Sequence, residues 1–257
     1  MSGTFAPAPG AAPFWRQVVA QARMEARLML RNGEQLLLAV VIPVIVLVGG
    51  VEGAKHVTLH ISHRPIDEFA PGVLALAIMS TAFTSLAIAT GFERRYGVIK
   101  RLGSSPLPRS GLLLGKVGAL LMVELFQVVV VGAIGFALGW EPASGPGTYA
   151  GFVLAIVLGT AAFGSLGLLM AGALRAEATL AAANLVYLLL MAAGAVVLPT
   201  TSYGAWGEVA RWLPSGALGD GMRAAFIDAR VDVTSLVVLA VWALLGTLLT
   251  ARTFRWE

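Results

Sequence analysis

The chain has 257 residues, of which 58% are hydrophobic and only 12% are charged. An average soluble domain carries about 25% charged residues, so this chain has too little polar surface for a water-soluble globule. The high hydrophobic content also excludes intrinsic disorder, and the absence of cysteine excludes disulfides and thiolate metal sites.

Six stretches are apolar and nearly free of charge, and each meets or approaches the length of about 20 residues that a helix needs to cross a bilayer. We therefore predict an all-α, polytopic membrane protein. The expected spans are roughly 35–53, 70–91, 112–138, 150–173, 179–199 and 233–251. Because six crossings are an even number, both termini should lie on the same side of the membrane.

The distribution of Lys and Arg predicts which side that is. The N-terminal segment, the loops after the second and fourth spans and the C-terminal tail hold 13 of the 18 basic residues. Cytoplasmic loops are rich in Lys and Arg, so we expect both termini in the cytoplasm and the chain in the cell membrane. Aromatic residues then fall near the outer interface: Trp140, Tyr149, Tyr203, Trp206 and Trp212.

The segment before the first span is expected to form an amphipathic helix over residues 14–31, after a flexible start at 1–13. Four arginines share one face of its helical wheel, opposite an apolar face: Arg16, Arg23, Arg27 and Arg31. Such a helix lies at the cytoplasmic interface. It is either a generic anchor or a docking helix for a cytoplasmic partner.

The loop 92–111, FERRYGVIKRLGSSPLPRSG, is the densest cluster of charge in the chain. Its Ser104, Ser105, Pro106 and Pro108 should end the preceding helix and force a turn. A short cytoplasmic helix between two spans is a natural contact for a soluble subunit. The alternative is a basic loop that only sets the orientation of the chain.

Polar residues inside the spans have two interpretations. Glu124 lies deep in the third span with Gln127 one turn further on, and an acid in a membrane faces either protein or water. Glu124 therefore lines a path for substrate or protons, or is a hydrogen-bonded packing residue. The same choice, between helix packing and a path, applies to Ser80, Thr81, Thr84 and Ser85 and to Asn184 and Tyr187.

The first outer loop holds the three histidines of the chain: His56, His60 and His63. On a single helix they would share a face with Glu52 and Asp67 and could bind a divalent metal. The alternation of apolar and polar residues over 57–62 instead favours a strand or a solvated loop. We favour the loop without metal.

The last outer segment, 200–232, mixes apolar residues with helix breakers. Pro214, Gly216, Gly219 and Gly221 are expected to interrupt any continuous helix. The segment either dips back into the outer leaflet as a re-entrant gate or packs as a surface loop. Non-helical backbone inside a membrane requires protein or water to satisfy it.

No catalytic motif is evident. GLLLGKV, at 111–117, has three residues between its glycines where a P-loop needs four, and no Ser or Thr follows its lysine. GALGDG, at 216–221, lacks the spacing of a dinucleotide turn. The chain is therefore not expected to be an enzyme or to bind ATP, a cofactor or nucleic acid. Active transport would need a partner or an ion gradient.

The order of these features resembles the permease subunits of ABC type-2 exporters, and in layout the daunorubicin/doxorubicin-type drug exporters. RMEARLMLRN with Ile42 and Pro43 in the first span is similar to the start of that family. The most specific match is FERRYGVIKRLGSSPLPRSGLLLGK at 92–116, although Gly97-Val98 stands where the family usually has Gly-Thr. WLPSGALGDGMRAAF, at 212–226, is similar to the family's stretch before the last span.

The resemblance implies one transmembrane domain that works with a separate ATP-binding subunit, which holds ATP and Mg, and with a second transmembrane subunit. Residues 98–106 would form the coupling helix, and 14–31 the connecting helix. The implied contacts with the ATPase are Glu93, Arg94, Val98, Lys100, Arg101, Leu102, Ser105, Pro106, Arg23 and Arg27. The implied path residues are Ser80, Thr84, Asn184 and Tyr187, beside which the residues themselves offer Glu124 for the path and Pro214 and Gly216 for an outer gate.

Three functions remain open from the sequence. The first is the export of a hydrophobic or amphipathic substrate such as a drug, antibiotic or lipid, with a role in efflux and antibiotic resistance. The second is an ion-coupled carrier that uses Glu124, although no convincing internal repeat is visible. The third is a membrane scaffold that transports nothing, which leaves the 92–116 match unexplained.

Overall fold

The structure is a computed structural model that describes residues 12–56, 62–103 and 107–253. Over these residues all regular secondary structure is helical, with no strand. The elements are α1 (Phe14–Arg31), α2 (Gly33–Leu36), η1 (Leu37–Val41), α3 (Ile42–Gly53), α4 (Pro65–Met79), η2 (Ser80–Ser85), α5 (Leu86–Arg95), α6 (Val98–Gly103), α7 (Arg109–Ala137), α8 (Pro146–Ala173), α9 (Ala176–Ala193), η3 (Thr200–Trp206), α10 (Gly207–Ala210), α11 (Pro214–Phe226) and α12 (Val233–Thr253).

Within the described residues, five helical units are long and apolar enough to cross a membrane, so the chain is an all-α polytopic membrane protein. Four of them, α7, α8, α9 and α12, correspond to the last four expected transmembrane spans. The fifth is the continuous rod of α4, η2 and α5 from Pro65 to Arg95, which covers the expected span 70–91. The expected end of the fifth span at residue 199 is wrong, because α9 ends at Ala193.

The first expected span, 35–53, is not one long α-helix. It consists of α2, the π-helical turn η1 and α3, and its apolar helical part, which includes the end of η1, runs over Ala39–Gly53. A π-turn carries an extra residue per turn and leaves the regular i→i−4 hydrogen bonding. The second span is interrupted in the same way by η2.

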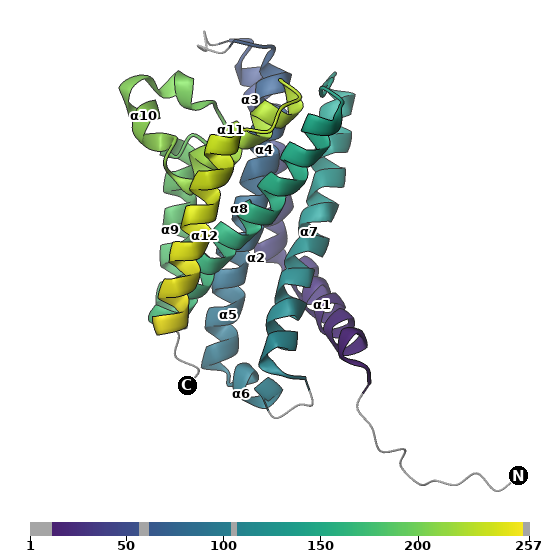
Figure 1. The fold of residues 1–257 in the computed structure, drawn as a ribbon, viewed down its shortest axis with the longest axis vertical. Coiled ribbons are helices and arrows are strands. Elements are labelled where there is room, and N and C mark those ends of the chain that lie inside the picture. Colours follow the sequence, from purple (N-terminus) through teal and green to yellow (C-terminus); the bar gives the residue numbers. More distant parts are fainter. Residues whose placement is uncertain (1–11, 57–61, 104–106, 254–257) are drawn as a thin grey trace, which may run out of the picture.

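The rod of α4, η2 and α5 is the centre of the molecule, and every residue from 69 to 88 is buried. It is enclosed by α3, α7, α8, α9 and α11, while α12 packs along α8 and α1 packs along α7 (Figure 1). Glycines on α8 permit its close approach. A Cβ atom added at Gly167 would lie 2.7 Å from the carbonyl oxygen of Phe83 in η2.

The two ends of the bundle differ in what they contain (Figure 1). At one end, here the α6 end, lie α6, the start of α1, the turn between α8 and α9 and the last turn of α12. At the other, the α10 end, lie α10, the end of α3 and the segment between α9 and α12. The described helices therefore run alternately between these two ends.

The helix break that we expected at Pro214 and the following glycines is wrong. Residues 214–226 form one α-helix, α11, in which Pro214 occupies the first turn. Proline is tolerated there because the N–H it lacks has no partner within the helix. The glycines are needed for packing instead, since a Cβ atom at Gly216 would lie 2.2 Å from the carbonyl oxygen of Ala210.

The arrangement of the first outer loop also rules out one of our alternatives. Glu52 is on α3, which ends at Gly53, and Asp67 is on α4, which begins at Pro65. The two acids and the histidines are therefore not on a common helix. The expected strand lies at 57–61, outside the described residues.

Candidate functional site

The expected coupling segment contains a short helix, α6, between α5 and α7 at the α6 end (Figure 1). Lys100 and Arg101 are exposed on it. Leu102 is half-buried and packs against a small cluster of Val18, Leu107 and Leu112. The apolar side of α6 thus contacts α1 and the start of α7, and its basic side faces outward. Ser105 and Pro106 lie outside the described residues.

The amphipathic segment forms α1, with the bounds that we expected. Arg23 and Arg27 are exposed, while Ala22 on the opposite face is buried against α7. Small residues on α7 let the two helices approach closely, and a Cβ atom at Gly115 would lie 2.6 Å from Cγ of Gln21. The two arginines are therefore available to a partner at the α6 end.

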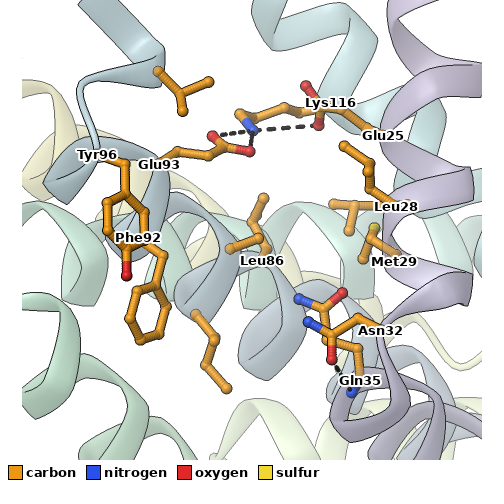
Figure 2. Close-up of a pocket in the computed structure, with 14 residues that line it drawn as sticks. Glu25, Leu28, Met29, Asn32, Gln35, Leu86, Phe92, Glu93, Tyr96 and Lys116 are labelled. Atoms are coloured by element: carbon orange, nitrogen blue, oxygen red, sulfur yellow. Dashed lines mark hydrogen bonds and ion pairs between the residues drawn. The ribbon is translucent and has the colours of Figure 1, made fainter.

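Glu93 does not stand at the surface as a simple contact residue. It belongs to a three-residue ion cluster in which Lys116 of α7 lies between two carboxylates (Figure 2). Lys116 Nζ is 2.7 Å from Glu93 Oε2 on α5 and 3.2 Å from Glu25 Oε2 on α1. The cluster joins three helices beside α6.

The cluster lines a cavity of about 290 Å³ whose other walls are mostly apolar, including Leu86 and Phe92 (Figure 2). Burial raises the pKa of Glu25 above its ordinary value of 4.5, against the opposing effect of Lys116. The sequence contained a sign of this arrangement, because Glu25 falls at the edge of the apolar face of the predicted helix. Its partner on α7 could not be identified from that pattern.

Arg94 and Arg95 connect α5 to the turn between α8 and α9. Arg94 donates to the carbonyl oxygens of Gly172 and Leu174, at 2.5 and 2.6 Å, and so caps the end of α8. Arg95 forms an ion pair with Glu177 on α9. A second cavity, of about 570 Å³, lies at this contact. The charged residues that line it are Arg94, Arg95, Lys100, Arg175 and Glu177. Its lining is predominantly basic.

The expected path residues Ser80 and Thr84 are fully buried inside the bundle, in η2. Neither reaches a surface from which a second subunit or a solute could contact it in this conformation. Tyr187 on α9 is also buried and faces Ser80, and Asn184 is half-buried one turn earlier. The structure therefore brings Tyr187 against Ser80 where η2 packs on α9, and it leaves Thr84 Oγ1 and Asn184 Oδ1 buried without a hydrogen-bond partner.

Glu124 is buried between α7 and α8, where its carboxylate accepts a hydrogen bond from Thr160 Oγ1 at 2.8 to 2.9 Å. Gln127, one turn further along α7, donates through Nε2 to the carbonyl oxygen of Ala39. Its Oε1 accepts from Thr81 Oγ1 at 3.0 Å. Both side chains thus have hydrogen-bond partners inside the protein, as their packing interpretation requires.

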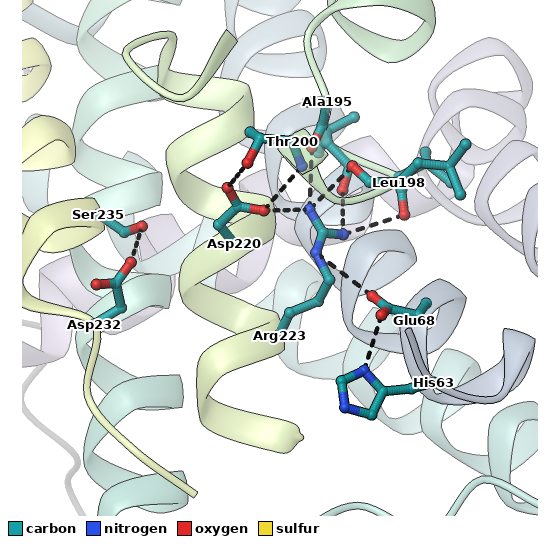
Figure 3. A network of polar contacts seen from close by, with 11 residues as sticks. His63, Glu68, Ala195, Leu198, Thr200, Asp220, Arg223, Asp232 and Ser235 are labelled. Atoms are coloured by element: carbon teal, nitrogen blue, oxygen red, sulfur yellow. Dashed lines mark hydrogen bonds and ion pairs between the residues drawn. The ribbon is translucent and has the colours of Figure 1, made fainter. Parts of the chain in front are cut away.

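The polar centre of the α10 end, which sequence reasoning missed, is the guanidinium of Arg223 on α11. Its side chain is buried and donates to four consecutive carbonyl oxygens in the segment after α9 (Figure 3). The acceptors, at 3.1 to 3.3 Å, are Ala195, Val196, Val197 and Leu198. Asp220 accepts from the same guanidinium at 2.9 Å, and Glu68 lies 4.0 Å from its Nε.

The segment 194–199 is irregular, yet residues 194–197 are buried. It passes between α4 and α11 at glycines, because Cβ atoms at Gly72 and Gly219 would lie 2.2 and 2.6 Å from the carbonyl oxygens of Val197 and Val196. Arg223 supplies the hydrogen bonds that buried backbone needs. The expected gate residues Pro214 and Gly216 therefore belong to the packed helix α11. The segment 194–199 beside this helix, held by Arg223, is called the clamped segment below.

Metal binding finds no support among the described residues, which contain no group of three potential ligands. His56 is exposed, and His63 Nδ1 lies 3.0 Å from Glu68 Oε1 (Figure 3). His60 lies outside the described residues.

The fold and the α6 end define a multi-pass membrane protein with a short basic helix between two of its spans. A family model described as ABC-2 type transporter matches residues 11–227. The chain therefore belongs to the ABC-2 type transporter membrane family, whose members act in the membrane with an ABC ATP-binding subunit. A comparison with curated proteins found no match.

Proposed function

We propose that this chain is the transmembrane permease subunit of an ABC exporter, moving a hydrophobic or amphipathic substrate out of the cell with ATP hydrolysed by a separate subunit. Both termini and the α6 end face the cytoplasm. The observation that carries this proposal is α6, a short helix with Lys100 and Arg101 exposed and Leu102 seated against α1 and α7.

In this proposal α6 is the coupling helix and α1 the connecting helix. The ATP-binding subunit contacts the exposed Lys100 and Arg101, together with Arg23 and Arg27. ATP binding moves α6, which pulls on α5 directly and on α1 through Leu102. The ion cluster of Glu25, Lys116 and Glu93 keeps α1, α5 and α7 together during that movement.

ATP and Mg are held by the partner, and this chain supplies no cofactor site and no enzymatic step. Two transmembrane subunits, either identical or close paralogues, enclose the path. Asn184 on α9 is half-buried, so it is the expected path residue that a second subunit can face in this conformation. The 92–116 match supports a drug-exporter-like subclass, with a role in efflux.

The segment 194–226 forms the outer closure of this exporter. α11 has 13 residues and is about 20 Å long, too short to cross a hydrocarbon core of about 30 Å. It packs against α4, α8 and α12 instead of standing at the surface. We place it as a re-entrant helix in the outer half of the membrane.

Reversal of charge at Lys100 and Arg101 tests this proposal. The variant with Lys100→Glu and Arg101→Glu is reconstituted with the ATP-binding subunit in vesicles, and ATP-driven movement of a fluorescent amphipathic dye is measured. We expect transport to fall about tenfold or more while membrane insertion and Tm stay unchanged. Arg252→Glu, exposed at the same end on α12, is the matched control. Normal transport and partner binding in the double variant would contradict the assignment.

The same assay separates the alternative functions. Vesicles without the ATP-binding subunit should show no transport, and Glu124→Gln should transport as well as the wild type when the subunit is present. Glutamine keeps an oxygen that can accept the hydrogen bond from Thr160. Transport without the subunit that Glu124→Gln abolishes would establish an ion-coupled carrier instead. No transport in any arm would favour a scaffold.

A further inference from the structure

The two π-helical turns lie side by side in the bundle. η1 interrupts the first span between α2 and α3, η2 interrupts the second between α4 and α5, and the two turns pack against each other. Each therefore separates a segment nearer the α6 end from a segment nearer the α10 end. π-helical turns inside α-helices occur frequently at functional sites.

The position of η1 follows from a proline. Pro43 has no N–H, so the helix cannot make the i→i−4 hydrogen bond to the carbonyl oxygen of Ala39. Ala39 is buried, and a buried carbonyl without a donor costs about 1–3 kcal/mol. Gln127 of α7 supplies the donor, since its Nε2 bonds to that carbonyl oxygen.

The other end of the same amide reaches η2. Thr81 Oγ1 donates to Gln127 Oε1 at 3.0 Å, and both side chains are buried. One side chain on α7 thus contacts both interrupted turns at once. Two hydroxyls of η2, those of Thr84 and Ser85, are buried without a hydrogen-bond partner.

We propose that Gln127 is a positioning residue for transport, which joins η1 and η2 into one intramembrane hinge. The halves of the first two spans nearest α6 then swing together, while α3 and α4 stay fixed, because they pack on each other and α4 also packs against α11. Through this hinge a movement of α6 is transferred to both spans. The transport role rests on the proposed function, whereas the clamp itself rests only on the contacts above.

Spin labels on either side of η1 test the clamp directly. The chain has no cysteine, so labels at Gly33→Cys and Gly53→Cys meet no native thiol. Both positions have open space where a side chain would start, and about 30 Å of helix separates them. We expect Gln127→Leu to broaden the measured distance distribution in the isolated protein. Val129→Leu, on the exposed side of the same helix, should leave it unchanged.

Pro43→Ala separates a hinge from simple packing. Alanine restores an N–H that can bond to the carbonyl oxygen of Ala39 without help from Gln127. Adding it to Gln127→Leu should therefore narrow the distance distribution again. Transport per ATP should stay about fivefold below wild type, because the first span is now a stiff helix. If transport per ATP recovers together with the narrow distance distribution, Gln127 acts only through packing, and the hinge is overturned.

A wild-type distance distribution in Gln127→Leu would overturn the clamp. This readout needs no ATP-binding subunit, so it remains valid if the proposed function fails. Conversely, if the wild-type protein shows no ATP-driven transport, the proposed function is refuted. The spin-label result then still decides whether the clamp exists. A broadened distribution with unchanged transport per ATP would keep the contact and reject its role in coupling.

Discussion

At the α6 end charged side chains are exposed or line cavities, whereas at the α10 end the central charge is buried and bonded to backbone. Lys100, Arg101, Arg23 and Arg27 all face outward, and the cluster around Lys116 borders a cavity. Arg223 has a side chain only 6% exposed and holds four carbonyl oxygens in place.

The difference shows how the two ends are suited to different tasks. Interactions of exposed charges contribute little to stability, so a partner can pair with exposed charges at small cost to the fold. Buried charge is retained only when many hydrogen bonds compensate its loss of water. We therefore expect substitutions at the α6 end to affect coupling, and substitutions at the α10 end to affect folding first.

The largest effect is expected at Arg223. Arg223→Leu leaves four carbonyl oxygens without their donor and Asp220 without its cation, which should cost about 3–5 kcal/mol and prevent accumulation of folded protein. Yield after detergent extraction and Tm measure this. Arg211→Leu, an exposed arginine on the same side of the bundle, is the control. If Arg223→Leu accumulates with an unchanged Tm, the clamped segment is not held as described.

Much of the fold could be predicted because a helix that crosses the bilayer needs a minimum length of apolar sequence. Charge-free runs revealed the long helices, and α1 was recognised from its four arginines opposite an apolar face. The helical character of 214–226 could not be predicted, because Pro214 and the glycines are also typical of loops. Only the neighbours of α11 show that these small residues make close contacts.

The candidate sites were less predictable, since they depend on which helices become neighbours. A stripe of Ser and Thr, including Ser80 and Thr84, is compatible with a path or with packing until the surrounding helices are known. Arg223 falls in the expected outer segment 200–232. Its partners are backbone carbonyls 25 to 28 residues earlier in the chain. No local sequence pattern reports such a contact.

A smaller effect is expected where the clamped segment passes α4. Gly72→Ala places a Cβ atom 2.2 Å from the carbonyl oxygen of Val197, so α4 or the segment must move. We expect a loss of about 1–3 kcal/mol, seen as a lower Tm in detergent. Gly132→Ala on α7 is the matched control, because no atom lies within 4 Å of its added Cβ and alanine favours helix. Equal Tm values for the two variants would argue against the close passage.

The smallest effect concerns the pH dependence of the α6 end. Since burial raises the pKa of Glu25 above 4.5, the folded protein holds that proton more tightly than the unfolded chain. The contribution of Glu25 to folding stability is therefore fully present below pH 4.5, the ordinary pKa of the group. It is lost as the pH rises through the raised pKa of Glu25 in the folded protein. Glu25→Gln removes the titrating group, so its Tm should fall less than that of the wild type between about pH 4.5 and pH 8. Glu208→Gln, exposed at the α10 end, is the control for loss of a surface carboxylate. If Tm depends on pH in the same way in Glu25→Gln and in the wild type, Lys116 keeps Glu25 ionised over the whole range, and Glu25 does not have a raised pKa.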